Sequence, residues 1–257
     1  MKLTILTVMT AVVSTFTTMA ADSKTGAEPS AIYEMRVYYA AEGKLDALNA
    51  RFRDHTMKLF EKHGIANVGY FVPEGANPDR KLVYFLSYPS REARDKSWKE
   101  FGADPDWQKA AKESEKDGRL VTKVEQFFLQ PTDYSPKMRS GNKGDHLYEL
   151  RTYTTPEGKL ADLDNRFKDH TIDLFTKHGM ENVIYWHRMD DQKDAKTTLV
   201  YLLAHKNKDA ANASWDGFRK DADWLKAKAE SEKNGALTVD KGVKSEFLVP
   251  TDYSPMK

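Results

Sequence analysis

Two acid–arginine pairs are the residues of this sequence best suited to hold a charged ligand. Glu34 and Arg36 stand two residues apart, and the same spacing returns at Glu149 and Arg151. A buried guanidinium can hold a carboxylate or a phosphate through two parallel hydrogen bonds. The same residues can instead form a structural network in which each glutamate satisfies its own arginine, because buried charges must be paired. The sequence leaves both interpretations open.

Two histidines have the chemistry of a general base or of a ligand to a metal or haem. His55 and His170 each stand between an aspartate and a threonine, and we expect each near the edge of an apolar helix stripe. The alternative is a structural histidine, hydrogen-bonded where helix meets sheet. No His-x-x-x-His spacing occurs, so we predict no metal site, and the sequence names no cofactor.

The composition excludes several classes of protein. Cysteine is absent, which removes disulfides, thiolate nucleophiles, zinc–thiolate sites and covalent haem attachment. Neither Gly-x-Ser-x-Gly nor a phosphate-binding glycine loop occurs, so a common serine hydrolase or a nucleotide enzyme is not indicated. The 40 Lys and Arg residues balance 39 Asp and Glu without a basic stripe, and we expect no nucleic-acid partner.

The chain is a tandem repeat. Residues 33–36 (Tyr-Glu-Met-Arg) return 115 positions later as residues 148–151 (Tyr-Glu-Leu-Arg). The hexapeptide Pro-Thr-Asp-Tyr-Ser-Pro closes both copies. A duplication of this kind makes each copy one structural unit. The predicted division is repeat 1 at residues 30–136, a polar linker at residues 137–145, and repeat 2 at residues 146–257.

In each copy the residue patterns predict strand, helix, strand, strand, helix and strand. The predicted elements of the first copy are a strand at 32–39, a helix from Gly43 to Gly64, strands at 67–72 and 82–88, a helix that starts at Ser90 and is interrupted at 102–104, and a strand at 124–129. This βαββαβ order is the ferredoxin-like pattern, an α+β fold with both helices on one face of the sheet.

The second face of each sheet must also be buried, because it would otherwise expose apolar side chains to water. The other copy can pack against it. We therefore expect two tandem ferredoxin-like units packed as a pseudo-dimeric α/β barrel. In the first strand, Tyr33, Met35 and Val37 alternate with the charged pair, and we expect this apolar set to meet the helices. Glu34 and Arg36 would then point towards the barrel interior or its mouth.

Residues 1–21 have the features of a cleavable secretory signal. Lys2 gives a positive start, residues 3–13 are apolar, and small residues stand at Ala20 and Ala21. The apolar run is well short of the roughly 20 residues that cross a bilayer. We therefore expect export to the periplasm or beyond, with no membrane span after cleavage.

The repeated motifs resemble the NIPSNAP family, a branch of the dimeric α/β-barrel superfamily. The resemblance rests on Tyr-Glu-(Met/Leu)-Arg in the first strand, on Lys-His-Gly at 62–64 and 177–179, and on Phe-Gly-Ala-Asp-Pro-Asp-Trp at 101–107. The second copy departs from the last motif at 218–224. The resemblance implies a ferredoxin-like barrel but no particular reaction, since superfamily relatives include haem-binding enzymes, monooxygenases and isomerases.

Two functions stay open. In the first, the chain binds or transforms a small molecule in a pocket between sheet and helices. The candidate ligand-binding residues are Arg36, His55, Arg151, His170, Glu34 and Glu149. In the second, the chain is a non-catalytic module that recruits a protein partner through its barrel surface or strand edges; self-association is a further option. Duplication can also have left one site working and the other decayed.

Overall fold

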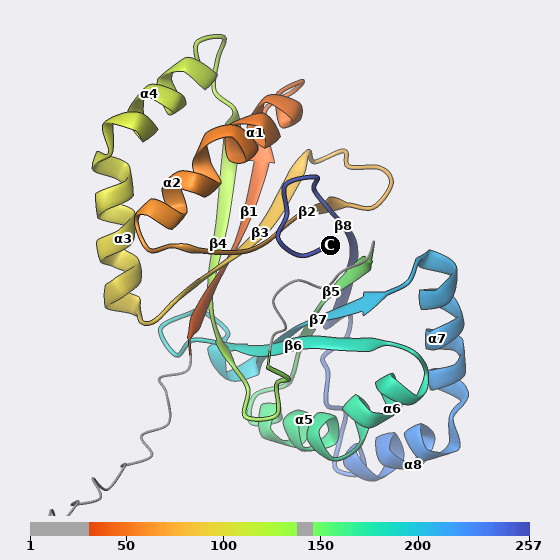
Figure 1. Cartoon of the computed structure of the whole chain (residues 1–257). Coiled ribbons are helices and arrows are strands. Elements are labelled where there is room, and N and C mark those ends of the chain that lie inside the picture. Colours follow the sequence, from red (N-terminus) through yellow and green to blue (C-terminus); the bar gives the residue numbers. More distant parts are fainter. Residues whose placement is uncertain (1–30, 138–145) are drawn as a thin grey trace, which may run out of the picture.

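A computed structural model describes residues 31–137 and 146–257 (Figure 1). The predicted export signal, residues 1–21, and residues 138–145 of the predicted linker lie outside the described residues. Within the two described ranges, no helix is both long enough and apolar enough to cross a membrane.

Each repeat folds into a four-stranded antiparallel sheet with its helices on one face, in the predicted order. Unit 1, residues 31–137, contains β1 (Ile32–Ala40), α1 (Leu45–Arg51), the π-helical turn η1 (Phe52–Thr56), α2 (Met57–Lys62), β2 (Ala66–Pro73), β3 (Lys81–Tyr88), α3 (Arg91–Ala103), α4 (Pro105–Ser114) and β4 (Val121–Pro131). Unit 2, residues 146–257, contains β5 (Leu147–Thr154), α5 (Leu160–Arg166), η2 (Phe167–Thr171), α6 (Ile172–Lys177), β6 (Glu181–Arg188), η3 (Ala195–Thr197), β7 (Thr198–His205), α7 (Lys208–Lys220), α8 (Ala222–Ser231) and β8 (Val243–Pro250).

Side-chain caps fix the start of the helices that follow the β3 and β7 strands. The Ser90 side chain accepts a hydrogen bond from the Ala93 N–H at the start of α3, which confirms the predicted start of this helix. Asn207 does the same for Ala210 at the start of α7. The matching caps place the two helices in the same way over their sheets, so positions along α3 and α7 can be compared one by one.

The first helix of each unit contains a π-helical turn that the sequence pattern does not predict. In this turn the Thr56 hydroxyl donates to the backbone oxygen of Arg51 at 3.1 Å, and Thr171 does the same for Arg166 at 3.0 Å. A π turn adds a residue to the helical repeat and so shifts its phase. The predicted place of His55 and His170 at the edge of the apolar stripe is therefore wrong, because both side chains are exposed.

The two sheets close into one eight-stranded barrel in the order β1-β3-β2-β8-β5-β7-β6-β4. At one seam β2 pairs with β8, with Phe71 opposite Pro250, and at the other β4 pairs with β6, with Leu129 opposite Arg188. Figure 1 shows the helices of each unit on the outside of the barrel, at opposite ends of the molecule. The predicted pseudo-dimeric α/β barrel is confirmed.

The repeated hexapeptide ties each unit to the other. Ser254, at the end of unit 2, accepts a hydrogen bond from the buried Tyr70 N–H of unit 1 at 3.0 Å. Ser135, at the end of unit 1, accepts from the Tyr185 N–H of unit 2, also at 3.0 Å. Each tail therefore satisfies a backbone donor of the opposite sheet, beyond the strand pairing that closes the barrel.

Glu34 and Arg36 point towards the helices, which corrects the prediction that they face the barrel interior. Met35 and Val37 are the residues that face inward, and they pack with Phe85 of unit 1 and Leu150 of unit 2. Because both faces of each sheet are buried, the alternation along β1 does not reveal which face is which. The apolar interior offers no partner for a charge, whereas α3 does.

Candidate functional site

In unit 1, the Glu34 carboxylate lies at the centre of a buried hydrogen-bonded cluster between β1 and α3. Arg36 donates to it at 2.5 Å, and Arg94 donates from Nε and Nη2 at 3.0 Å each. The Tyr88 hydroxyl and the Trp98 indole N–H donate to its second oxygen at 3.0 and 3.3 Å. Glu34 is fully buried, and two guanidinium groups offset its charge.

Arg36 is held by further groups of the same cluster. Its Nη1 also donates to Gln126 Oε1 on β4 at 3.0 Å, and its Nη2 donates to the Tyr38 hydroxyl at 3.3 Å. The guanidinium carbon lies 4.5 Å from the centroid of the Trp98 ring. Gln126 reaches this place because it stands opposite Arg36 in the pairing of β1 with β4.

In unit 2, Glu149 holds the same central place with a different set of donors. Arg151 Nη1 and the Ser245 hydroxyl donate to one carboxylate oxygen at 2.5 and 2.6 Å. His205 Nε2 and the Trp215 indole N–H donate to the other at 3.0 and 2.7 Å. The carboxylate therefore has four protein donors, although unit 2 contributes only one arginine to the cluster.

The Arg151 guanidinium is positioned by aromatic side chains. Its Nε donates to the Tyr201 hydroxyl at 2.9 Å, its Nη2 donates to the Tyr153 hydroxyl at 3.1 Å, and its carbon lies 4.2 Å from the Trp215 ring centroid. With the bond to Glu149, three of the five guanidinium N–H groups are used. No described residue accepts a hydrogen bond from the other two.

Both glutamates are anions at neutral pH. Burial by itself would raise the pKa of each carboxyl. In unit 2 the hydrogen bond from His205, the charge of Arg151 and the remaining donors outweigh burial and lower the pKa of Glu149 to about 2. In unit 1 the hydrogen bonds and charges of Arg94 and Arg36 lower the pKa of Glu34. Neither acid is thus placed to donate a proton.

The two clusters differ at three matching positions. The pairs are Arg94 and Ala211, Gln126 and Ser245, and Tyr88 and His205. Arg94 and Ala211 each stand four residues after the helix N-cap, and Gln126 and Ser245 each stand opposite the cluster arginine. Each exchange puts a smaller side chain into unit 2.

A groove of about 500 Å³ opens in unit 2, which we call the unit-2 groove. Its lining comes from β5, β8 and α7: Glu149, Arg151, Ser245, Phe247, Asn212, Trp215, Asp216 and Arg219. At the matching place in unit 1, the Arg94 guanidinium is bonded to Glu34 and lies 5.1 Å from the centroid of the Phe128 ring. The Arg94 side chain therefore covers Glu34 in unit 1, whereas unit 2 has only the methyl group of Ala211 at the matching position.

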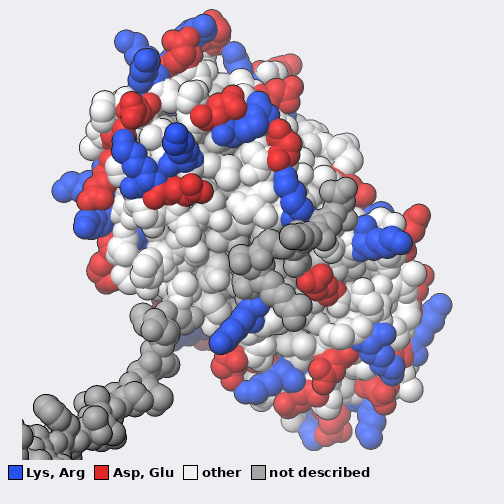
Figure 2. Space-filling model, viewed as in Figure 1, with Lys and Arg blue, Asp and Glu red and all other residues white. Residues whose placement is uncertain are grey.

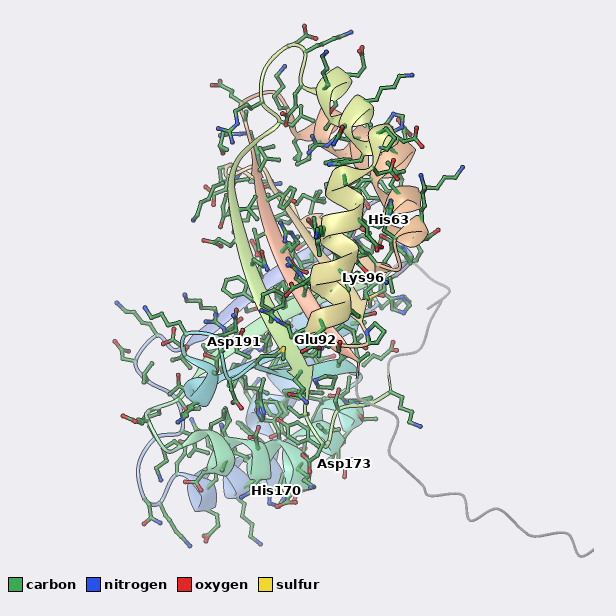
Figure 3. All side chains as sticks on the ribbon, turned by 90° about the vertical axis from the view of Figure 1, so that its left-hand side faces the viewer. His63, Glu92, Lys96, His170, Asp173 and Asp191 are labelled. Carbon is green, nitrogen blue, oxygen red and sulfur yellow. The ribbon has the colours of Figure 1, made fainter. Side chains whose placement is uncertain are left out.

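His55 and His170 belong to neither cluster. His55 lines an outer groove of about 720 Å³ between the η1–α2 stretch and α4. His170 lines one of about 270 Å³ beside α8, and Figure 3 shows it in the helical layer of unit 2. The structure thus brings Glu34 to Arg36 and Glu149 to Arg151 but keeps the histidines apart from them. A ligand role for either histidine stays a prediction.

Neither the charge on the face drawn in Figure 2 nor the acidic side chains of the described residues indicate a nucleic-acid or metal partner. In the space-filling view, Lys and Arg are interspersed with Asp and Glu over the helices at both ends of the molecule (Figure 2). Within residues 31–137 and 146–257, no group of three or more His, Cys, Asp or Glu side chains could hold a metal ion. The two buried carboxylates are instead surrounded by protein donors.

The residues that distinguish the clusters are not among the candidates that the sequence motifs indicate. Trp98 and Trp215 pack in the core with ring centroids 5.3 Å from those of Phe60 and Phe175 respectively. Their indole N–H groups also donate to the buried glutamates. A position-by-position comparison of the two copies contains the exchange of Arg94 for Ala211.

The closed barrel of two ferredoxin-like units, with a helical layer outside each sheet, defines a dimeric α/β-barrel protein whose two halves lie on one chain. Residues 33–136 and 148–255 each match the NIPSNAP family. The chain belongs to that family.

Solved structures show the same fold over most of the chain. A "putative monooxygenase" from Lactobacillus acidophilus is 12% identical and has a TM-score of 0.52, and the match covers 86% of this chain and 94% of that protein. A protein of the same description from Fusobacterium nucleatum is also 12% identical, with coverages of 86% and 92% and a TM-score of 0.52. An anthrone oxidase-like protein is 9% identical, with coverages of 89% and 94% and a TM-score of 0.55. Among curated proteins none matches the sequence significantly. Identities this low show the fold alone.

Proposed function

We propose that this protein is exported and binds a small molecule in the unit-2 groove. The exchange of Arg94 for Ala211, one of the three differences between the two clusters, carries the proposal. Both units have a buried glutamate, an arginine two residues later and a tryptophan against that arginine. In unit 1 an arginine from α3 lies over them, and in unit 2 they line a groove of about 500 Å³. Residues 1–21 support the export.

Arg151 is the group that we expect to contact the ligand. In unit 1 the amide oxygen of Gln126 accepts from Arg36 at 3.0 Å. At the same place in unit 2, the Ser245 hydroxyl is directed to Glu149, so the corresponding donor of Arg151 is free for a ligand oxygen. A carboxylate is the acceptor that a guanidinium binds best. The neighbouring rings of Trp215 and Phe247 suit an apolar or aromatic part of the same molecule.

Binding can be tested with 4-fluorobenzoate, which combines a carboxylate with an aromatic ring. Its binding to the mature chain can be measured by a titration detected with fluorine NMR. We expect saturable binding that S245Q and A211R weaken roughly ten-fold or more, because each restores a side chain that fills the site in unit 1. S245Q changes an exposed position and keeps the test valid should A211R, at a buried position, fail to fold.

The matched control is K99A, because Lys99 is exposed on α3 and is the unit-1 counterpart of the groove residue Asp216. It should leave the titration unchanged. Equal binding by the native chain and both groove variants would overturn the proposed site. So would a native chain that binds neither this probe nor another small carboxylate at millimolar concentration.

A further inference from the structure

Arg94 shows which chemical group the cluster can accommodate above its buried acid. Its guanidinium donates to both Glu34 oxygens at 3.0 Å and lies 5.1 and 5.2 Å from the ring centroids of Phe128 and Trp98. The three counterparts of these contacts in unit 2 all line the unit-2 groove: Glu149, Phe247 and Trp215. A carboxylate flanked by two aromatic rings is a suitable environment for a cation.

We infer that the ligand of the unit-2 groove is a small zwitterion. Its oxygen acceptor, a carboxylate or a similar group, binds Arg151, and its guanidinium or ammonium group takes the place that the Arg94 guanidinium holds in unit 1. The inference rests on the proposed function, because it concerns the same groove and names the class of molecule that enters it.

The charges of the two units agree with a ligand that carries both signs. Asp95 accepts a hydrogen bond from Arg94 at 3.1 Å, and its counterpart in unit 2 is Asn212. Unit 2 therefore has Ala211-Asn212 where unit 1 has Arg94-Asp95, and it lacks one positive and one negative charge at this place. The charged side chains that line the groove form two ion pairs, Arg151 with Glu149 and Arg219 with Asp216. A zwitterion adds no net charge to this balanced lining, whereas a simple anion or cation does.

The two ligand groups need to lie only a few bonds apart. In unit 1, Gln126 and Glu34 both contact Arg36 Nη1, and Arg94 Nη2 contacts the same Glu34 oxygen that Arg36 does. The acceptor and the cation thus stand on either side of a single ion pair. A short chain can therefore present both groups to Arg151 and Glu149 at once.

Ser245 gives the groove a donor that can move when a cation enters. Its hydroxyl donates to Glu149 at 2.6 Å on the oxygen that also binds Arg151. The matching oxygen of Glu34 binds Arg94 instead. A serine hydroxyl rotates freely and can accept as well as donate, so Ser245 can release that oxygen to the ligand cation and accept a hydrogen bond from it.

The test compares 4-guanidinobutanoate with 6-methylheptanoate, in which carbon replaces the guanidinium nitrogens and the heavy atoms are connected in the same way. Titration calorimetry on the full mature chain should give about ten-fold tighter binding of the guanidino acid, with one site per chain. In A211R this preference should disappear, because the new guanidinium takes the place of the ligand cation. S245Q should weaken both acids, because the new amide oxygen takes the place of their carboxylate on Arg151. Circular dichroism verifies that both variants keep the native fold. R94A combined with Q126S should raise the stoichiometry from one site to two.

The possible failures are distinguishable. Equal binding of both acids by the native chain, with both weakened in S245Q, would overturn the zwitterion and leave the proposed binding site intact. If the R94A/Q126S chain still binds only one molecule, the cluster of unit 1 is not equivalent to the unit-2 groove even without the Arg94 and Gln126 side chains. Binding of neither acid, together with no binding of 4-fluorobenzoate, would remove both proposals.

Discussion

Arg94 reaches from α3 to Glu34 on β1 and donates to both of its carboxylate oxygens, at 3.0 Å each. Ala211 stands at the same place in unit 2, where Ser245 donates to the buried glutamate at 2.6 Å instead. The two halves of this duplicated chain have therefore kept the same acid and arginine while they differ in what lies over them. Duplication permits this, because one half can maintain the fold while the other changes its side chains.

Replacement of Arg94 should destabilise the protein. In R94A the buried Glu34 loses two charge-assisted hydrogen bonds, so we expect the free energy of unfolding in urea to fall by about 2 to 3 kcal/mol. R53A is the control, because Arg53 makes its ion pairs on the exposed surface and its loss should have little effect. If R94A is no more destabilising than R53A, Arg94 does not support the cluster.

The hexapeptide tails should contribute to stability by joining the units. S254A leaves the N–H of the fully buried Tyr70 without its acceptor, and we expect a loss of about 1 to 3 kcal/mol in urea unfolding. S135A should have a similar effect through Tyr185, and the two losses should add. T122A, which removes an exposed hydroxyl, should change little. An S254A chain as stable as the T122A chain would show that the tail contact is dispensable.

The fold could be predicted from the sequence because its evidence is local and is present twice. The alternating residues of β1, the Ser90 cap of α3 and the two copies of the hexapeptide each indicate one element or boundary. The direction of Glu34 could not be predicted in this way. Alternation identifies two faces of a strand, and only the partners on α3 decide which face a charged residue takes.

The contact between the paired acid and arginine could be predicted from the sequence, whereas a ligand role for these residues stays a prediction. Glu149 and Arg151 stand two residues apart on one strand face, so their contact follows from strand geometry. The groove beside them depends on the small side chain of Ala211. An alanine in a helix does not by itself indicate a site. The position of His170 could not be predicted from an ideal helical repeat, because the π-helical turn η2 shifts the phase of the helix there.

Export can be tested on the chain itself. If residues 1–21 form a cleavable signal, the mature protein begins at Ala21 or Asp22. Expression of the full chain in a bacterial host, followed by intact-mass measurement of the periplasmic or secreted fraction, should give the mass of one of these two products. Replacement of Ala20 and Ala21 by bulky residues should prevent cleavage. Recovery of the uncleaved native chain from the cytoplasm alone would contradict export.

The buried Glu149 should make stability depend on pH in a defined window. Its pKa in the folded protein is lowered from 4.5 to about 2, so the folded state favours the ionised form. A lowered folded-state pKa contributes stability that is complete above the unfolded value and is lost as the pH falls towards the folded value. The native chain should thus lose on the order of 3 kcal/mol relative to E149Q between about pH 4.5 and pH 2. Urea unfolding of both chains at several pH values measures this difference directly.

The control is D190N, which changes an exposed loop position. Its free energy of unfolding should follow that of the native chain across the window. A native-minus-E149Q difference that stays constant across the window would show that Glu149 is not held as an anion by Arg151 and its neighbours.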